Sequence, residues 1–290
     1  MDRTIPADAN VFVVLFSTDG ALLHGLCSDL KLRSWDAASG ALRRTIAFDP
    51  GDAAPSLTPA GLTTIGKDGA LKSWDLASGK LTGRLPAAGF RRAAKAPDGS
   101  FVLANSATDT RVRAVDVSGK ERFTVPAGHG GLGSLAVSPD GRNVVAASYD
   151  ADVRAWNARN GELLRLIDEL PVSMFDMKFS PDGKLLAAAG ADRTVYLYDT
   201  ATWHQRSKWS GQPEMISSLA FSPDGKRLAT GGFSELTVKH PVKVLVWDVA
   251  TGKPQRTVDA PARVSSVAFS PDGQTLAVAA GQKSVALWSV

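Results

Sequence analysis

The chain has 290 residues, of which 44% are hydrophobic and 21% are charged, a balance typical of a folded protein and not of a disordered one. Its net charge of +4 comes from 33 basic residues spread among 29 acidic ones, and no run of five Lys or Arg occurs. We therefore expect no nucleic-acid partner and no membrane partner. Cys27 is the only cysteine, which excludes an intrachain disulfide and a cysteine-based zinc site.

The N-terminal stretch "MDRTIPADANVFVVLF" does not have the basic region, apolar region and small-residue cleavage site of a secretory signal. No apolar run reaches the length of about 18 residues that a membrane-spanning helix needs. From these two observations we expect a cytoplasmic protein.

Seven similar turns follow one another along the chain. Four read "SPDG", at Ser138–Gly141, Ser180–Gly183, Ser222–Gly225 and Ser270–Gly273; three weaker copies are "STDG" at Ser17–Gly20, "TPAG" at Thr58–Gly61 and "APDG" at Ala96–Gly99. Pro presets φ, Asp bonds the nearby backbone and Gly accepts positive φ, so each copy predicts a tight reversal of the chain.

A second mark follows most of these turns by 18 residues. It reads Trp35-Asp36, Trp74-Asp75, Val115-Asp116, Trp156-Asn157, Tyr198-Asp199, Trp247-Asp248 and Trp288-Ser289. Between turn and mark lie two short runs typical of strands, such as "RNVVAAS" and "DVRAWNA". After each mark but the last comes another turn and a further run, such as "LRRTIAF", so each unit holds four predicted strands in about 41 residues.

A four-stranded unit that recurs seven times, with Trp-Asp at the end of its third strand, resembles the WD-repeat β-propeller family. The resemblance covers essentially the whole chain. It implies one domain, residues 1–290, that is all-β: a seven-bladed propeller whose blades are four-stranded antiparallel sheets.

The two ends of the chain fit together in this scheme. The last unit stops at "SVALWSV", its third strand, whereas "DRTI" at Asp2–Ile5 resembles the fourth strands "QRTV" and "RRTI". We predict that Asp2–Ile5 completes the last blade and closes the ring, because an unpaired sheet edge would otherwise be left open.

The segment "GHGGLG", Gly128 to Gly133, matches the G-x-G-x-x-G pattern of dinucleotide sites. That pattern has meaning only where a helix opens at its third glycine, and here two β-like runs follow. We interpret the segment as a structural turn between blades.

The resemblance implies that His129 would join Asp150 and Trp156 in a hydrogen-bonded group, with Ala146 where Ser or Thr is usual. In the second blade Thr64, Asp68 and Trp74 match the members of this group.

The sequence offers little catalytic chemistry. His24 and Cys27 lie three apart on a predicted strand and therefore point to opposite faces, so they cannot form a dyad. No G-x-S-x-G, H-E-x-x-H or P-loop motif occurs. We expect no enzymatic activity and no cofactor or metal. The alternative is a lactonase- or quinoprotein-like propeller that acts on a small molecule at the mouth of its channel.

The resemblance places partner binding on the face formed by the connections between blades and the loops between second and third strands. Aromatic and Arg residues are the types that interface hot spots use. The candidate protein-binding residues carried over onto that face are aromatic, apolar or basic: Phe12, Lys67, Arg91, Tyr149, Phe175, Met215 and Arg263. Phe12 and Phe175 have a second interpretation, as core residues between blades.

Blade six is irregular, because 25 positions separate Ser222 from Trp247 where the first, fourth, fifth and seventh units have 18. The extra residues fall in "FSELTVKHPVK" and add Glu235 and His240 to the candidates, although a neutral insertion explains the loop equally well. Trp203 and Trp209 form either a lateral patch or outer-strand packing.

We predict a cytoplasmic, monomeric interaction scaffold that binds an acidic protein or peptide segment with apolar anchors.

Overall fold

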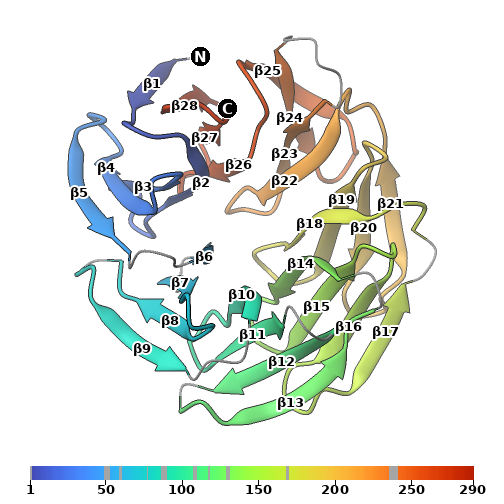
Figure 1. Cartoon of the computed structure of the whole chain (residues 1–290). Helices are drawn as coiled ribbons and strands as arrows, with labels where there is room; N and C mark the ends of the chain where they lie inside the picture. The colour runs from blue at the N-terminus through green and yellow to red at the C-terminus, as the bar shows by residue number, and fades with distance from the viewer. Residues whose placement is uncertain are drawn as a thin grey trace. The chain divides into compact units, whose positions relative to one another are not determined.

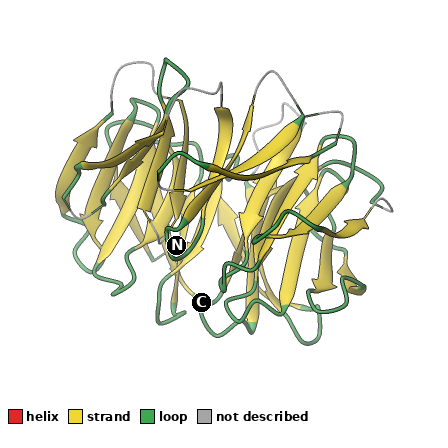
Figure 2. Ribbon diagram, turned by 90° about the horizontal axis from the view of Figure 1, so that it is seen from below, coloured by secondary structure: helices red, strands yellow, loops and turns green. Residues whose placement is uncertain are grey.

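The computed structural model describes residues 2–48, 53–58, 61–76, 78–85, 90–106, 110–116, 118–128, 131–167, 170–234 and 241–290; at 53–56, 58, 90–92, 102 and 104–106 the description is of the backbone alone. Every regular element in these ranges is a strand (Figure 2). The described residues contain no helix that is long and apolar enough to cross a membrane. The all-β prediction is confirmed.

The strands form two compact units, one made of Met1–Ala47 and Lys178–Val290 and the other of Phe48–Met177. The strands are arranged in four-stranded sheets, and in each sheet they follow chain order with one exception at the chain ends (Figure 1). The antiparallel pairing of neighbours follows from the short turns that join them.

The first unit holds three complete sheets. They are β2 (Val11–Phe16), β3 (Leu22–Cys27), β4 (Lys31–Asp36) and β5 (Leu42–Ala47); β22 (Met215–Phe221), β23 (Arg227–Phe233), β24 (Val242–Asp248) and β25 (Pro254–Ala260); and β26 (Ser266–Phe269), β27 (Thr275–Ala279), β28 (Ser284–Ser289) and β1 (Arg3–Pro6).

The second unit also holds three complete sheets. They are β6 (Ala53–Thr58), β7 (Gly61–Ile65), β8 (Leu71–Trp74) and β9 (Leu81–Leu85); β10 (Phe90–Lys95), β11 (Phe101–Ser106), β12 (Arg111–Asp116) and β13 (Glu121–Pro126); and β14 (Leu132–Val137), β15 (Asn143–Ser148), β16 (Val153–Asn157) and β17 (Leu163–Ile167).

One further sheet contains β18 (Met174–Phe179), β19 (Leu185–Gly190), β20 (Val195–Asp199) and β21 (Gln205–Trp209). Its first strand crosses the boundary between Met177 and Lys178, so this blade belongs to neither unit alone. The propeller fold with four-stranded blades is confirmed, but six blades and not the predicted seven are complete within the units. The sequence repeat could not show this division, because the turns and marks of β18–β21 are as regular as the others.

The predicted pairing of the chain ends is confirmed, with strand bounds one residue later than expected. β1 pairs antiparallel with β28, Ile5 lies opposite Val285 and its side chain is fully buried. The Asp2 amide extends the pairing by donating to the carbonyl of Leu287 at 3.0 Å. Figure 1 shows the two ends of the chain close together on this sheet.

The "SPDG" turns are built as the sequence predicted, with one contribution that the pattern of Pro, Asp and Gly did not reveal. In the turn at Ser180–Gly183 the serine Oγ donates to the Asp182 carboxylate at 2.6 Å and accepts the Leu185 amide at 2.9 Å. Gly183 has a φ of 72°, in the left-handed region that glycine tolerates. The serine hydroxyl therefore bridges the Asp carboxylate of the turn and the amide of the following strand. The serines of all four "SPDG" turns are buried.

Candidate protein-binding face

Two kinds of segment meet on one face of the blades: the connections that enter the inner strands and the turns between second and third strands. In blade one, the Ser28 amide in the turn donates to the Asn10 carbonyl in the connection at 2.8 Å. In blade four, the Tyr149 amide donates to the Gly131 carbonyl at 3.0 Å in the same way. Each turn is therefore hydrogen-bonded to its connection, so side chains from both segments can contact one ligand.

Arg263 and two apolar side chains lie together in the first unit. The Arg263 guanidinium lies over the ring of Phe233, with its Cζ 4.2 Å from the ring centroid. Phe233 pairs across the sheet with Met215, and Arg263 is exposed while Met215 is half-buried. The ring holds the cation in place by a cation–π contact without neutralising it, which leaves the charge available to an acidic group.

Backbone and serine contacts continue this surface from blade six to blade one. The Val264 amide donates to the Gly232 carbonyl at 2.7 Å, and the Ser217 hydroxyl donates to the Val264 carbonyl at 2.9 Å. The Ser265 hydroxyl then reaches the Val11 carbonyl at 3.5 Å. Phe12, next in the chain, is half-buried. We call Phe12, Met215, Phe233 and Arg263 the first-unit rim.

Blade one of the first unit contains a charged group that the sequence reasoning missed. Arg33 is buried and donates twice to Asp29, at 2.8 and 2.7 Å, while the Asp8 carboxylate lies 3.7 Å from its Nη2. Hydrogen bonding from Arg33 lowers the pKa of the Asp29 carboxyl. Blade one and the connection before it therefore carry two carboxylates around one buried guanidinium.

In the second unit Tyr149 is the most exposed aromatic candidate, with 46% of its surface accessible. Its carbonyl accepts a 2.7 Å hydrogen bond from the Ser173 hydroxyl, two residues before half-buried Phe175. Lys67 is exposed in the turn that precedes β8. The Ser173 hydroxyl thus links the turn that holds Tyr149 to the connection that leads to Phe175, and Lys67 belongs to another blade of the same unit.

Three candidates cannot be placed by their side chains. Glu235 and His240 lie outside the described residues, and Arg91 is described only by its backbone in β10. Trp203 and Trp209 are both buried, and Trp209 stacks on Trp247 with ring centroids 5.9 Å apart. The lateral-patch hypothesis for these two tryptophans is therefore wrong, and the outer-strand packing alternative is confirmed for Trp209.

Blade six contains a buried polar chain in the connection that leads to β22. The Trp247 Nε1 donates to the Thr230 hydroxyl at 2.9 Å, and that hydroxyl donates to the Gln212 side-chain oxygen at 2.7 Å. The Gln212 Nε2 donates in turn to the Lys243 carbonyl at 2.8 Å. Glu214 is buried beside Gln212, with its Oε2 3.4 Å from the Gln212 Nε2. These contacts tie the connection to the base of the long loop.

The family model described as "WD domain, G-beta repeat" matches four segments, 119–157, 169–199, 203–239 and 252–289, which together make up half of the chain. The chain belongs to the WD-repeat family. A search of curated proteins finds no match to it.

The hydrogen-bonded group expected of WD repeats is present in part. In the second blade Trp74 donates to Thr64 at 2.9 Å, as predicted, and the Asp68 carboxylate accepts the Ala70 amide. In the fourth blade Ala146 and Trp156 are buried, while His129 lies outside the described residues.

Gln212 stands three residues before β22, as His129 stands three before β14, so blade six uses an amide at the position of the histidine. Only the preceding Gly211 could have signalled this in the sequence.

The "GHGGLG" segment leads into a strand, as expected. Backbone conformation and lack of space explain why glycine occupies three of its positions. Gly128 and Gly131 have φ values of 108° and 82°. A Cβ on Gly133 would lie 2.4 Å from the Met174 carbonyl oxygen, which leaves no space for a side chain. The segment continues into β14, where a dinucleotide site would need a helix.

His24 and Cys27 do not act together. His24 Nδ1 lies 2.8 Å from the Ser34 hydroxyl, and the Cys27 thiol points to the Gly25 carbonyl at 3.7 Å. Burial lowers the pKa of His24 and raises that of the Cys27 thiol. His24 and Ser34 are both buried, so the pair is closed to a substrate. Within the described ranges, no group of three or more His, Cys, Asp or Glu is arranged to hold a metal.

Proposed function

We propose that the protein is a non-enzymatic interaction scaffold that binds a protein or peptide segment on the face formed by the inter-blade connections and the second-to-third-strand turns. The contact that carries the proposal is Arg263 over Phe233, because an exposed, positioned arginine beside aromatic and apolar side chains is the composition of an interface hot spot. The family supports the same role, since WD-repeat propellers commonly bind proteins.

The partner that suits this face carries acidic residues and apolar anchors. Arg263 offers a charge whose own contact is an aromatic ring, so a carboxylate of the partner would be its first full counter-ion in the described surroundings. Half-buried Met215, the cross-strand partner of Phe233, offers apolar surface beside this contact, and half-buried Phe12 follows Val11, whose carbonyl the Ser265 hydroxyl reaches. In the second unit, Tyr149 with its 46% exposure provides a similar anchor.

The proposal extends to the domain organisation, the oligomeric state and the location of the protein. We propose that the blades, β18–β21 included, form one seven-bladed domain over residues 1–290 that acts as a cytoplasmic monomer without a cofactor. The pairing of β1 with β28 supports this proposal, because it joins the first residues to the last blade.

Affinity capture from a lysate of the source organism tests the proposal. The baits are wild type, Arg263→Glu and Tyr149→Ala, and the matched control is Arg256→Glu, which reverses an exposed charge on the outer strand of blade six. Captured proteins are identified by mass spectrometry, purified and titrated against each bait. We expect a partner that the control retains and that Arg263→Glu or Tyr149→Ala loses.

Equal affinity of all four baits for every partner would contradict the placement of the face. Absence of any partner would contradict the scaffold role and direct attention to small-molecule binding, the alternative function.

A further inference from the structure

The outer strands of the blades share one register, which allows them to be compared residue by residue. In each outer strand one buried residue pairs with the third-strand residue that lies three places before the first residue of the Trp-Asp mark. In blade four, for example, Ile167 pairs with Val153, three places before Trp156. The equivalent buried residues are Ile5, Ile46, Leu85, Val125, Ile167, Trp209 and Val258.

The fourth blade's outer strand, β17, departs from all the others at two positions of this register. The residues one and three places before the buried residue are polar in the other six strands, namely Thr4 and Asp2, Thr45 and Arg43, Arg84 and Thr82, Thr124 and Arg122, Lys208 and Arg206, and Thr257 and Gln255. In β17 they are Leu166 and Leu164, which are 36% and 39% exposed. Since residues two apart in a strand point to the same side, they form a leucine stripe.

The edge of β17 is also open. In the described part of the chain β17 pairs with β16 and is the last strand of its sheet. Edge strands are usually protected from pairing with other chains by charged side chains or proline. β17 carries one charge, Arg165, and an additional exposed leucine, Leu163, of a kind that Leu42 and Leu81 provide in blades one and two.

Arg165 indicates the chemistry of an occupant. It lies between the two leucines in sequence, and its exposed side chain points to the opposite side of the strand; it forms no ion pair with any residue that the structure describes. A strand added to this edge would place its residues directly opposite those of β17, where oppositely charged pairs and apolar pairs stabilise a sheet. A carboxylate opposite Arg165, flanked by apolar residues opposite Leu164 and Leu166, is complementary at all three positions.

We propose that β17 is a second interaction surface, which binds an extended partner segment of the pattern apolar–acidic–apolar by adding it as a further strand of blade four. Strand addition draws its affinity from main-chain hydrogen bonds and its specificity from alternate side chains. This surface is formed by an outer strand and is independent of the face assigned above, so either can be correct without the other.

The test uses a short fluorescein-labelled peptide with the central sequence Thr-Leu-Glu-Leu-Thr, and a matched peptide with Lys in place of Glu, titrated by fluorescence anisotropy. Wild type is expected to bind the Glu peptide saturably and the Lys peptide about tenfold more weakly. The double variant Leu164→Thr/Leu166→Thr, which carries threonine as several of the other outer strands do, is expected to bind about tenfold more weakly. Arg165→Glu is expected to reverse the preference between the two peptides.

Leu42→Thr is the control, because it removes an exposed leucine from another outer strand, and it is expected to bind as wild type does. Circular dichroism of every variant shows whether it is folded. Undiminished binding by the double variant, or an unchanged preference in Arg165→Glu, would overturn the proposal.

Sedimentation analysis of wild type and the double variant tests the other possible occupant of this edge, which is a second copy of the same chain. A monomeric wild type agrees with the proposal. Self-association of wild type that the leucine substitutions abolish would mean that a second copy of this chain covers β17, which would also overturn it.

Discussion

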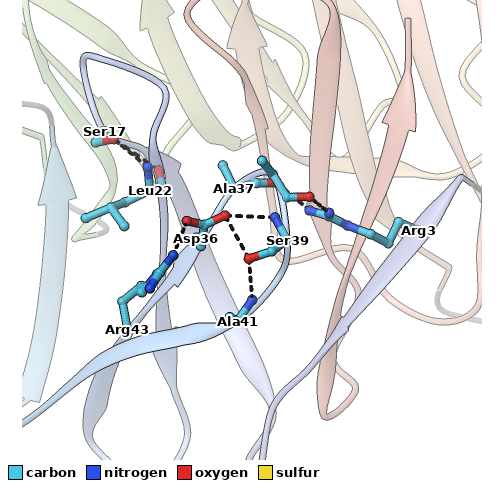
Figure 3. A network of polar contacts seen from close by, with 9 residues as sticks. Arg3, Ser17, Leu22, Asp36, Ala37, Ser39, Ala41 and Arg43 are labelled. Carbon is cyan, nitrogen blue, oxygen red and sulfur yellow. Dashed lines mark hydrogen bonds and ion pairs between the residues drawn. The ribbon is translucent and has the colours of Figure 1, made fainter.

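Arg3 donates hydrogen bonds from its guanidinium to the carbonyls of Ala37 and Ala38, and so links the N-terminal strand in the last blade to the turn after the third strand of blade one (Figure 3). The same turn is braced by Asp36, which accepts from the Ser39 amide and hydroxyl at 2.8 Å and from Arg43 at 2.7 Å. The first residues of the chain therefore stabilise two neighbouring blades.

Deletion of residues 2–6 is expected to lower the melting temperature markedly. Ile5 is fully buried, and burial of such a side chain is worth about 1.5–3 kcal/mol, to which the lost pairing with β28 and the Arg3 contacts add. Differential scanning calorimetry of the deletion, of Arg3→Ala and of Thr4→Ala as an exposed control measures the effect. An unchanged melting temperature in the deletion would show that β1 does not stabilise the last blade.

Thr230→Val is expected to destabilise the protein by about 1–3 kcal/mol, because it leaves the buried Trp247 indole N–H and the Gln212 carbonyl without the hydroxyl that joins them. Thr257→Val is the matched control, since Thr257 is exposed on β25. Urea denaturation followed by tryptophan fluorescence measures both free energies of unfolding. A loss no larger than that of the control would mean that the polar chain of blade six does not contribute to stability.

The repeats and the turn chemistry could be predicted because they depend on local sequence. The Ser and Asp of an "SPDG" turn lie within five residues of the groups they bond, and the Trp marks are recognised by their regular spacing along the chain. The resemblance of Asp2–Ile5 to other fourth strands was sufficient to predict its pairing with β28, although the bounds moved by one residue.

The candidate site was predictable as a set of positions but not as a set of contacts. Phe233 was not predicted as the partner of Arg263, because the two are 30 positions apart and meet only through the packing of blade seven on blade six. Arg33 and Gln212 were missed for a related reason: each is buried by a tertiary contact and looks like an ordinary polar residue of a strand or loop.

The buried His24 is expected to make stability fall with acidification near neutral pH. Burial lowers its pKa below the ordinary value of 6.5 in the folded state, and the Arg44 charge acts in the same direction while Asp19 opposes it. Below pH 6.5 the unfolded chain therefore binds a proton that the folded protein resists, so stability present above that pH is lost as the pH falls toward the folded-state pKa.

Melting temperatures of wild type and His24→Gln at pH 7.5 and 5.5 test this expectation, where the glutamine keeps a hydrogen-bonding group for Ser34 but does not titrate. We expect the wild type to lose more on acidification than the variant. Equal losses in the two proteins would assign the pH dependence to other groups.

The two members of the Arg33–Asp29 pair are expected to differ in the cost of their removal. The Arg33 side chain is 5% exposed, whereas Asp29 retains 31% and can be hydrated. Asp29→Asn leaves a buried guanidinium with only Asp8, 3.7 Å away and largely in solvent, as its counter-ion. Breaking a buried pair in this way costs about 3–5 kcal/mol, whereas replacing the cation by an apolar side chain of similar length is often nearly neutral.

Arg33→Met is therefore expected to be less destabilising than Asp29→Asn, and the double variant is expected to recover most of the stability that Asp29→Asn loses. Urea denaturation of the three variants gives the coupling energy of the pair directly. The reverse order, with Arg33→Met the more damaging, would mean that the arginine stabilises blade one mainly through the packing of its side chain and not through its charge.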